Sequence, residues 1–164
     1  MTTANGTVTA TIGIADENLT EVSLKLSKIL ADEYVLYTKT KNFHWNVQGI
    51  NFIALHLFFD ELAEEIENNI DLVAERVRSL GHFPAATLKE FLELTNLLES
   101  SHDNGSAKGM IQALVDDHET IIGELRREIP VINDKYKDLG TADLLTQIIE
   151  KHELLAWKLR AHLG

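Results

Sequence analysis

Apolar side chains recur along this chain at steps of three and four residues, the spacing that places them on one face of an α-helix. The longest such stripe runs from Phe52 to Leu80 and predicts a helix over residues 51–80. A similar stripe predicts a helix over residues 19–47. Because the chain has only two prolines, both stripes run without a strong helix breaker.

Two further stripes occupy the second half of the chain. One runs from Ile111 to Ile129 and predicts a helix that ends or kinks at Pro130, whose ring clashes with the preceding turn. After a charged loop at residues 133–140, another stripe extends to Leu163. Each of these segments is long enough to span a domain, so both are expected to be major helices.

Helix-capping patterns locate two helix starts. Asn18 is followed three residues later by Glu21, and Thr87 is followed three residues later by Glu90. This spacing is typical of a capping box, in which the two residues satisfy each other's backbone N–H groups. The first pair would begin the helix at residue 19, and the second would begin a short helix that reaches about residue 97.

Together these elements predict an all-α fold, a four-helix bundle with a short extra helix in the connection between its second and third helices. With 164 residues the chain has the size of one domain. Residues 18–164 would form the bundle, and residues 1–17, rich in Thr, Ala and Gly, would form a flexible arm.

The net charge of the chain favours some classes of binding partner over others. Twenty-six acidic residues face fifteen basic ones, for a net charge of −11. Such a surface repels nucleic-acid phosphates and attracts cations. There is no cysteine, so a thiolate metal site and disulfides are excluded. No stretch of about eighteen apolar residues is present, so we expect no membrane partner and a cytoplasmic location.

Side chains that bind metals line the edge of the 51–80 stripe. His56 and Asp60 are four residues apart, as are Asp71 and Glu75, and His44 approaches from the end of the first helix. Two imidazoles with three carboxylates form a nitrogen and oxygen ligand set. Such a set suits iron, zinc or manganese better than calcium, which prefers oxygen ligands alone.

The two halves of this ligand set are too far apart to share one ion on a straight helix. His56 and Asp71 are separated by fifteen residues, or roughly 22 Å along a helix axis. Other helices of the same bundle could complete each half, the residues could be an unrelated surface band, or two antiparallel copies could join their halves. An intrachain di-iron site uses Glu-x-x-His twice. The match at 99–102 lies in a polar turn, so the shared site is favoured.

Over residues 19 to 163 the chain resembles the Dps proteins, the mini-ferritins named as DNA-binding proteins from starved cells. The resemblance rests on Lys41-Asn42-Phe43-His44-Trp45-Asn46-Val47, Gly49, Phe52, Leu55-His56, Phe59-Asp60-Glu61 and Asp71-Leu72-Val73-Ala74-Glu75-Arg76. It implies a ferritin-like dodecamer, a homo-oligomeric hollow shell. This shell would oxidise Fe(II) with hydrogen peroxide in preference to dioxygen, store ferric mineral and protect against oxidative stress.

The resemblance also implies roles for individual residues. His44, His56 and Asp60 of one subunit would bind iron together with Asp71 and Glu75 of its neighbour, and zinc could substitute for iron. Trp45 would take part in radical chemistry beside the site, although simple interface packing explains it equally well. Iron-entry pores would be lined by acidic residues that could instead cap or solvate a loop, namely Asp134, Asp138 and Asp143.

Other interpretations remain open. The family name suggests a nucleoid protein that coats DNA, but the first basic residue here is Lys25, so weak or no DNA binding is predicted. A helical scaffold without metal, or one that holds zinc or manganese, is a further alternative. His118 and His152 lie on core stripes and are interpreted as hydrogen-bonded core residues, and Trp157 is also assigned to the core.

Overall fold

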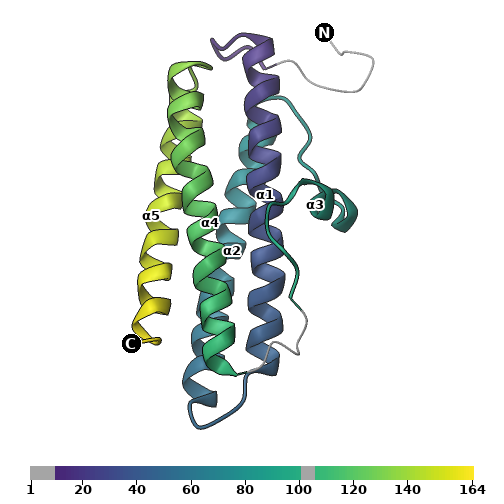
Figure 1. The fold of residues 1–164 in the computed structure, drawn as a ribbon. Coiled ribbons are helices and arrows are strands. Elements are labelled where there is room, and N and C mark those ends of the chain that lie inside the picture. The colour runs from purple at the N-terminus through teal and green to yellow at the C-terminus, as the bar shows by residue number, and fades with distance from the viewer. Residues whose placement is uncertain (1–9, 101–105) are drawn as a thin grey trace.

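The computed structural model describes residues 10–100 and 106–164, and within these residues every regular element is a helix. Four long helices form an antiparallel bundle, and a short one lies outside it (Figure 1). The all-α prediction with a short extra helix is therefore confirmed. The helices are α1 (Asp16–Asn46), α2 (Phe52–Ser79), α3 (Leu88–Leu94), α4 (Ala107–Asp134) and α5 (Leu139–Ala161).

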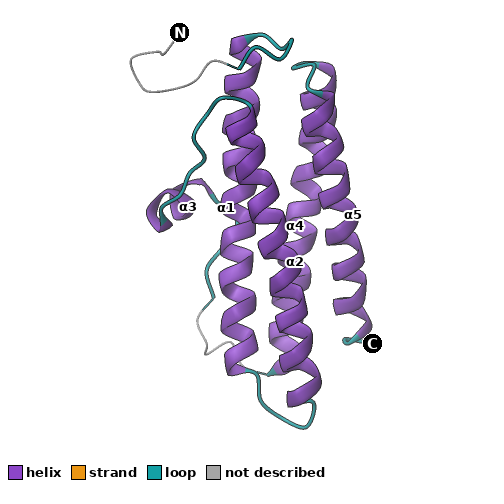
Figure 2. Ribbon diagram, turned by 180° about the vertical axis from the view of Figure 1, so that it is seen from behind, coloured by secondary structure: helices purple, strands orange, loops and turns teal. Residues whose placement is uncertain are grey.

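The bundle consists of two helical hairpins, α1 with α2 and α4 with α5, joined by a long crossover connection. This connection runs along the outside of α1 and carries α3 there (Figure 2). The apolar stripes meet between the four long helices, where Phe43, Phe59 and Leu125 are fully buried. Burial of this apolar surface is the main force that holds the hairpins together.

The start of α1 differs from the prediction. The helix begins at Asp16, and its N-cap, Ala15, offers no side-chain hydrogen bond. Asn18 lies inside the helix and donates its side-chain amide to the carbonyl of Tyr136 at 3.2 Å. The capping box predicted for Asn18 is therefore wrong. Acidic Asp16 and Glu17 fill the first turn instead, where negative charge stabilises the positive end of the helix dipole.

The second capping box is confirmed at α3. The backbone N–H of Glu90 donates to the Thr87 hydroxyl at 3.3 Å, and the backbone N–H of Thr87 donates to the Glu90 carboxylate at 3.0 Å. The Thr87 hydroxyl also donates to the Glu90 carboxylate at 2.7 Å, and this bond is the largest cause of the lowered pKa of the Glu90 carboxyl, followed by the backbone N–H groups of Ala86 and Thr87. The short helix ends at Leu94, about three residues earlier than predicted.

Pro130 does not end α4, so the first of its two predicted effects, an end or a kink, is not found. It lies inside the helix, which continues to Asp134. A proline deprives the carbonyl four residues earlier of its donor, but Arg126 is exposed, so water can reach that group. The following loop is shorter than predicted, because α5 already begins at Leu139.

Trp157 is also misassigned by the sequence. It is 60% exposed in the chain, whereas Leu155 and Leu159 on the same helix are buried. Positions three and four apart share a helix face, and Trp157 lies midway between these two core positions on the opposite face. None of the helices in residues 10–100 and 106–164 is sufficiently long and apolar to cross a bilayer.

Candidate metal centre

The turn between α1 and α2 brings His44 and His56 face to face. Their ring centroids are 3.9 Å apart, and the ring planes are nearly parallel, at 19°. The Nδ1 of His44 lies 2.7 Å from the backbone carbonyl of His56, and the Nδ1 of His56 lies 2.8 Å from the carbonyl of His44. A carbonyl can only accept, so each Nδ1 carries the hydrogen. Each Nε2 therefore keeps a free lone pair, the arrangement found in metal-binding histidines.

Asp60 follows His56 by one helical turn and joins the pair. Its Oδ1 lies 3.8 Å from the Nε2 of His44. The same oxygen accepts a hydrogen bond from the Lys41 ammonium at 2.7 Å. This bond lowers the pKa of the Asp60 carboxyl and raises the pKa of Lys41. Three of the five predicted ligands thus lie near one another, the carboxylate of Asp60 and the imidazoles of His44 and His56, although these three are not positioned to hold one ion.

The other two predicted ligands lie elsewhere. Asp71 and Glu75 are exposed on α2, about three turns beyond Asp60. Among residues 10–100 and 106–164, no three His, Asp or Glu side chains are placed to hold an ion within one chain. The structure therefore does not unite the two halves in a single subunit. The Glu-x-x-His match covers residues 99–102, and its histidine lies outside the described residues.

Aromatic side chains lie near the histidine pair. Phe52 stacks on His56 with ring centroids 5.2 Å apart, so the ring of His56 contacts those of both Phe52 and His44. Trp45 is 67% exposed, and the Lys41 ammonium lies 5.9 Å from its ring centroid. The Lys41 ammonium therefore lies beside both the Asp60 carboxylate and the Trp45 ring.

Comparison with known proteins assigns the fold to a family. Residues 24–164 match the ferritin-like domain family. DNA protection during starvation protein 2 of Bacillus anthracis is 40% identical over 139 residues, which are 85% of this chain and 94% of that protein. The chain belongs to the Dps family of ferritin-like proteins.

Solved Dps structures agree along nearly the whole length. A Dps protein from Bacillus brevis superposes with a TM-score of 0.86 at 38% identity, and covers 90% of this chain and 98% of its own. DpsC from Streptomyces coelicolor gives a TM-score of 0.92 at 30% identity, with coverage of 96% and 92%. The predicted Dps resemblance and the ferritin-like bundle are thereby confirmed.

The acidic residues predicted to line a pore in this Dps chain differ from one another. Asp138 is buried as the N-cap of α5, where one carboxylate oxygen accepts from Arg76 at 2.8 Å and from the Thr141 backbone at 2.9 Å. Its other oxygen accepts from the Thr141 hydroxyl. We therefore assign Asp138 to the helix cap. The pore prediction now rests on the exposed residues Asp134 and Asp143.

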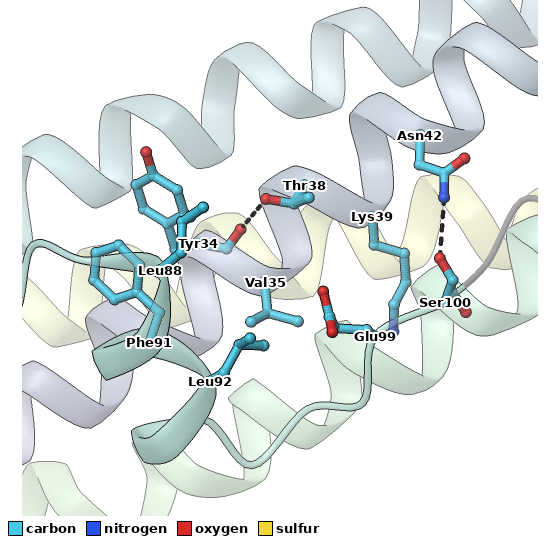
Figure 3. Close-up of a pocket in the computed structure, with 10 residues that line it drawn as sticks. All are labelled: Tyr34, Val35, Thr38, Lys39, Asn42, Leu88, Phe91, Leu92, Glu99 and Ser100. Atoms are coloured by element: carbon cyan, nitrogen blue, oxygen red, sulfur yellow. Dashed lines mark hydrogen bonds between the residues drawn. The ribbon is translucent and has the colours of Figure 1, made fainter.

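A separate cavity of about 170 Å³ lies between α1 and the crossover connection (Figure 3). Its walls are largely apolar, with Val35, Phe91 and Leu92 among them, and Lys39 lies at one side. Lys39 is paired with the buried carboxylate of Asp117, whose pKa is raised by burial despite this bond. No predicted iron ligand lines the cavity, so it is distinct from the metal centre.

Sequence reasoning missed the contacts made by Lys41 and Phe52, although both belong to the quoted motif. The sequence contains the relevant spacing, because Lys41 precedes His44 by three residues and Phe52 precedes His56 by four. These spacings place the side chains on the same helix face as the ligands. The core assignment of His118 and His152 is confirmed, since both are fully buried and hydrogen-bonded to each other.

Proposed function

We propose that this Dps protein oxidises Fe(II) and stores the ferric product, and that each oxidation site is shared between two copies of the chain. One observation carries the proposal: the reciprocal carbonyl bonds of His44 and His56 leave both Nε2 lone pairs available beside Asp60. Neutral imidazoles and a carboxylate suit Fe(II). The family membership supports the same chemistry, since a solved Dps relative from Vibrio cholerae is described as a ferritin-like diiron-carboxylate protein.

In this proposal Asp71 and Glu75 of a neighbouring copy complete the ligand set. A two-fold axis would place the second half of each chain against the first half of the other and create two equivalent sites. Exposed apolar side chains on the ligand-bearing helices support such contact, namely Trp45, Ile53, Leu57 and Leu72. A dodecameric shell built from such pairs is part of the proposal.

The ligand charges explain how oxidation is favoured. Carboxylates stabilise Fe(III) more than Fe(II) because the product carries the higher charge. Hydrogen peroxide accepts two electrons, so two Fe(II) ions and two protons convert one peroxide into two water molecules. Consuming both electrons together avoids release of a hydroxyl radical. Two Fe(II) ions supply the two electrons that peroxide needs, whereas reduction of dioxygen to water needs four, so we expect peroxide to be the better oxidant. Trp45 is a candidate donor to, or trap for, stray radicals.

Zinc is expected to occupy the same ligands and inhibit oxidation, since it accepts nitrogen and oxygen donors but has no redox chemistry. Iron entry past Asp134 and Asp143, and a cytoplasmic location, stay predictions. In this location the protein would remove Fe(II) and peroxide together and so protect the cell against oxidative stress.

DNA coating is the less supported alternative. Several relatives are named DNA protection during starvation proteins, which describes those proteins. In this chain the basic residues near the C-terminus are already paired, Lys158 with Glu61 at 2.9 Å and Arg160 with Glu119 at 2.7 Å. Together with a net charge of −11 this predicts weak or no DNA binding near neutral pH. A duplex retarded in a gel shift at low salt would contradict the prediction.

The proposed activity is tested by adding Fe(II) anaerobically, then peroxide, and following ferric absorbance. The double variant His56→Ala/Asp60→Ala should oxidise iron no faster than protein-free buffer. A matched double variant, His162→Ala/Asp116→Ala, removes the same residue types from exposed positions and should keep the wild-type rate. Equal rates in the wild type and the site variant would contradict the proposal and favour a structural or zinc-binding role.

A further inference from the structure

A polar cluster lies within the hydrophobic core, away from the iron ligands. Glu33 on α1, His118 on α4 and His152 on α5 are each 0% exposed. Full burial of a carboxylate and two imidazoles is costly unless their charges and hydrogen bonds are matched. The proposed iron chemistry uses none of these three side chains, so the cluster needs its own explanation.

The three side chains form a continuous chain of short contacts. His152 lies in the middle, with its Nε2 2.7 Å from Glu33 Oε1 and its Nδ1 2.8 Å from the Nδ1 of His118. Both ring nitrogens of His152 are therefore bonded within the cluster. At its two ends, Glu33 Oε2 and His118 Nε2 are buried and have no hydrogen-bond partner among the described residues.

The protonation states of the three side chains determine the net charge of the cluster. If both imidazoles were neutral and Glu33 ionised, the cluster would carry one negative charge in the core. Lys39 on α1 donates to Asp117, and Lys151 on α5 donates to Asn69 and lies 3.8 Å from Glu65, so neither lysine pairs with Glu33. A buried charge without a partner costs several kcal/mol. One additional proton removes that cost.

We propose that the cluster is a buried proton-binding site, in which His152 carries the additional proton as an imidazolium that donates to Glu33 through Nε2 and to His118 through Nδ1. The proton resides on His152 because an imidazole is more basic than a carboxylate. His118 remains neutral: burial, and then the charge of His152, hold the pKa of His118 well below its ordinary value. The ion pair is neutral overall, as the dry core requires.

The carboxylate of Glu33 is the only anion that contacts the ring of His152 within this cluster. Glu33→Gln removes this anion, so the folded chain no longer gains by holding an additional proton on His152.

Nitrogen NMR of the assembled protein tests the proposal directly. The chain contains seven histidines, and ¹⁵N-histidine labelling with magic-angle spinning separates imidazolium from neutral rings in a large particle. At about pH 8.5, two units above the ordinary histidine value, one ring should still have both nitrogens protonated. That signal should vanish in Glu33→Gln and persist in Glu93→Gln, which removes an exposed carboxylate of the same type.

Two results would overturn the proposal. One is a spectrum in which every histidine ring of the wild-type protein has an unprotonated nitrogen at this pH. The other is an imidazolium signal that survives in Glu33→Gln. Because the wild-type spectrum alone decides the first point, the test does not depend on whether the variant folds. Iron oxidation is not part of the measurement, so the two proposals succeed or fail separately.

Discussion

Among the residues that the structure describes, two pairs of histidines are in contact, and the two pairs differ in what their ring nitrogens bond to. His44 and His56 lie at the end of the α1–α2 hairpin, and their Nδ1 atoms bond to backbone carbonyls. His118 and His152 lie in the bundle centre, and their Nδ1 atoms bond to each other. The first pair thus keeps its Nε2 lone pairs available near solvent, whereas in the second pair His152 uses its Nε2 on Glu33.

The difference shows that residue type does not define a metal site. Both pairs have a carboxylate within 4 Å, Asp60 in one case and Glu33 in the other. What separates them is the partner of each nitrogen and access to the surface. A backbone carbonyl fixes a ring without consuming its second nitrogen. When other side chains bond to both nitrogens of a ring, no ring nitrogen is left to bind an ion.

The largest effect on stability is expected at the buried histidine pair, His118 and His152. His152→Ala would leave Glu33 as a buried carboxylate without its partner, at a cost of about 3–5 kcal/mol in the free energy of unfolding. Iron oxidation by the variant that still assembles should match the wild type. Denaturant unfolding measures the first effect, and ferric absorbance the second. A stability loss below about 1 kcal/mol would mean that Glu33 and His152 do not form a charged pair.

For the pair His44 and His56, we expect the main effect on iron binding rather than on stability. His44→Ala removes a ligand nitrogen, and we expect Fe(II) affinity to fall on the order of 100-fold. Fe(II) titration under anaerobic conditions measures this, with His162→Ala as the control at an exposed histidine. If His44→Ala bound Fe(II) as tightly as the control, the first histidine pair would not be a metal ligand.

Acid should destabilise the protein through the buried pair. The pKa of His118 is lowered in the folded chain, so below about pH 6.5 the unfolded chain binds a proton that the folded chain does not. Stability should fall with decreasing pH by up to about 1.4 kcal/mol per pH unit from this residue. Unfolding curves at pH 7.5 and 5.5 measure the slope, which His118→Gln should reduce. An unchanged slope would assign acid sensitivity to other groups.

The smallest effect is expected at Lys41. Its bond to Asp60 lies at the surface, with side chains 22% and 43% exposed, and exposed ion pairs are weak. Lys41→Met should therefore tighten Fe(II) binding about two- to five-fold, since the ammonium no longer competes for the carboxylate. Lys41→Arg, which keeps the charge, serves as the control. Weaker binding in Lys41→Met would show that the lysine assists the site.

Much of the fold follows from the sequence because helical periodicity is a local property. The stripe from Phe52 to Leu80 located α2 to within about a residue at each end, and the spacing of His56 and Asp60 placed both on one face. The errors arose where tertiary contacts override local signals. Asn18, for example, bonds to Tyr136, which is distant in sequence. Trp157 is a different kind of error, because the spacing of Leu155 and Leu159 already places it on the opposite helix face.

The sequence indicates candidate ligands for the site, but it gives neither their tautomers nor their charge partners. The motif around His44 indicates a ligand, but the reciprocal carbonyl bonds depend on how the α1–α2 turn closes. Likewise Asp138 has the same residue type as Asp134, and only the position of Arg76 on another helix distinguishes a buried cap from an exposed carboxylate. Contacts between helices determine these features, so spacing along one helix cannot give them.

Subunit complementation tests the shared site most directly. His56→Ala/Asp60→Ala and Asp71→Ala/Glu75→Ala should each be inactive alone, since each destroys one half of every site. When the two variants are co-assembled at random, each mixed dimer regains one intact site, so about a quarter of the wild-type oxidation rate should return. A mixture that stays as inactive as the separate variants, although mixed assemblies form, would contradict a site shared between two chains.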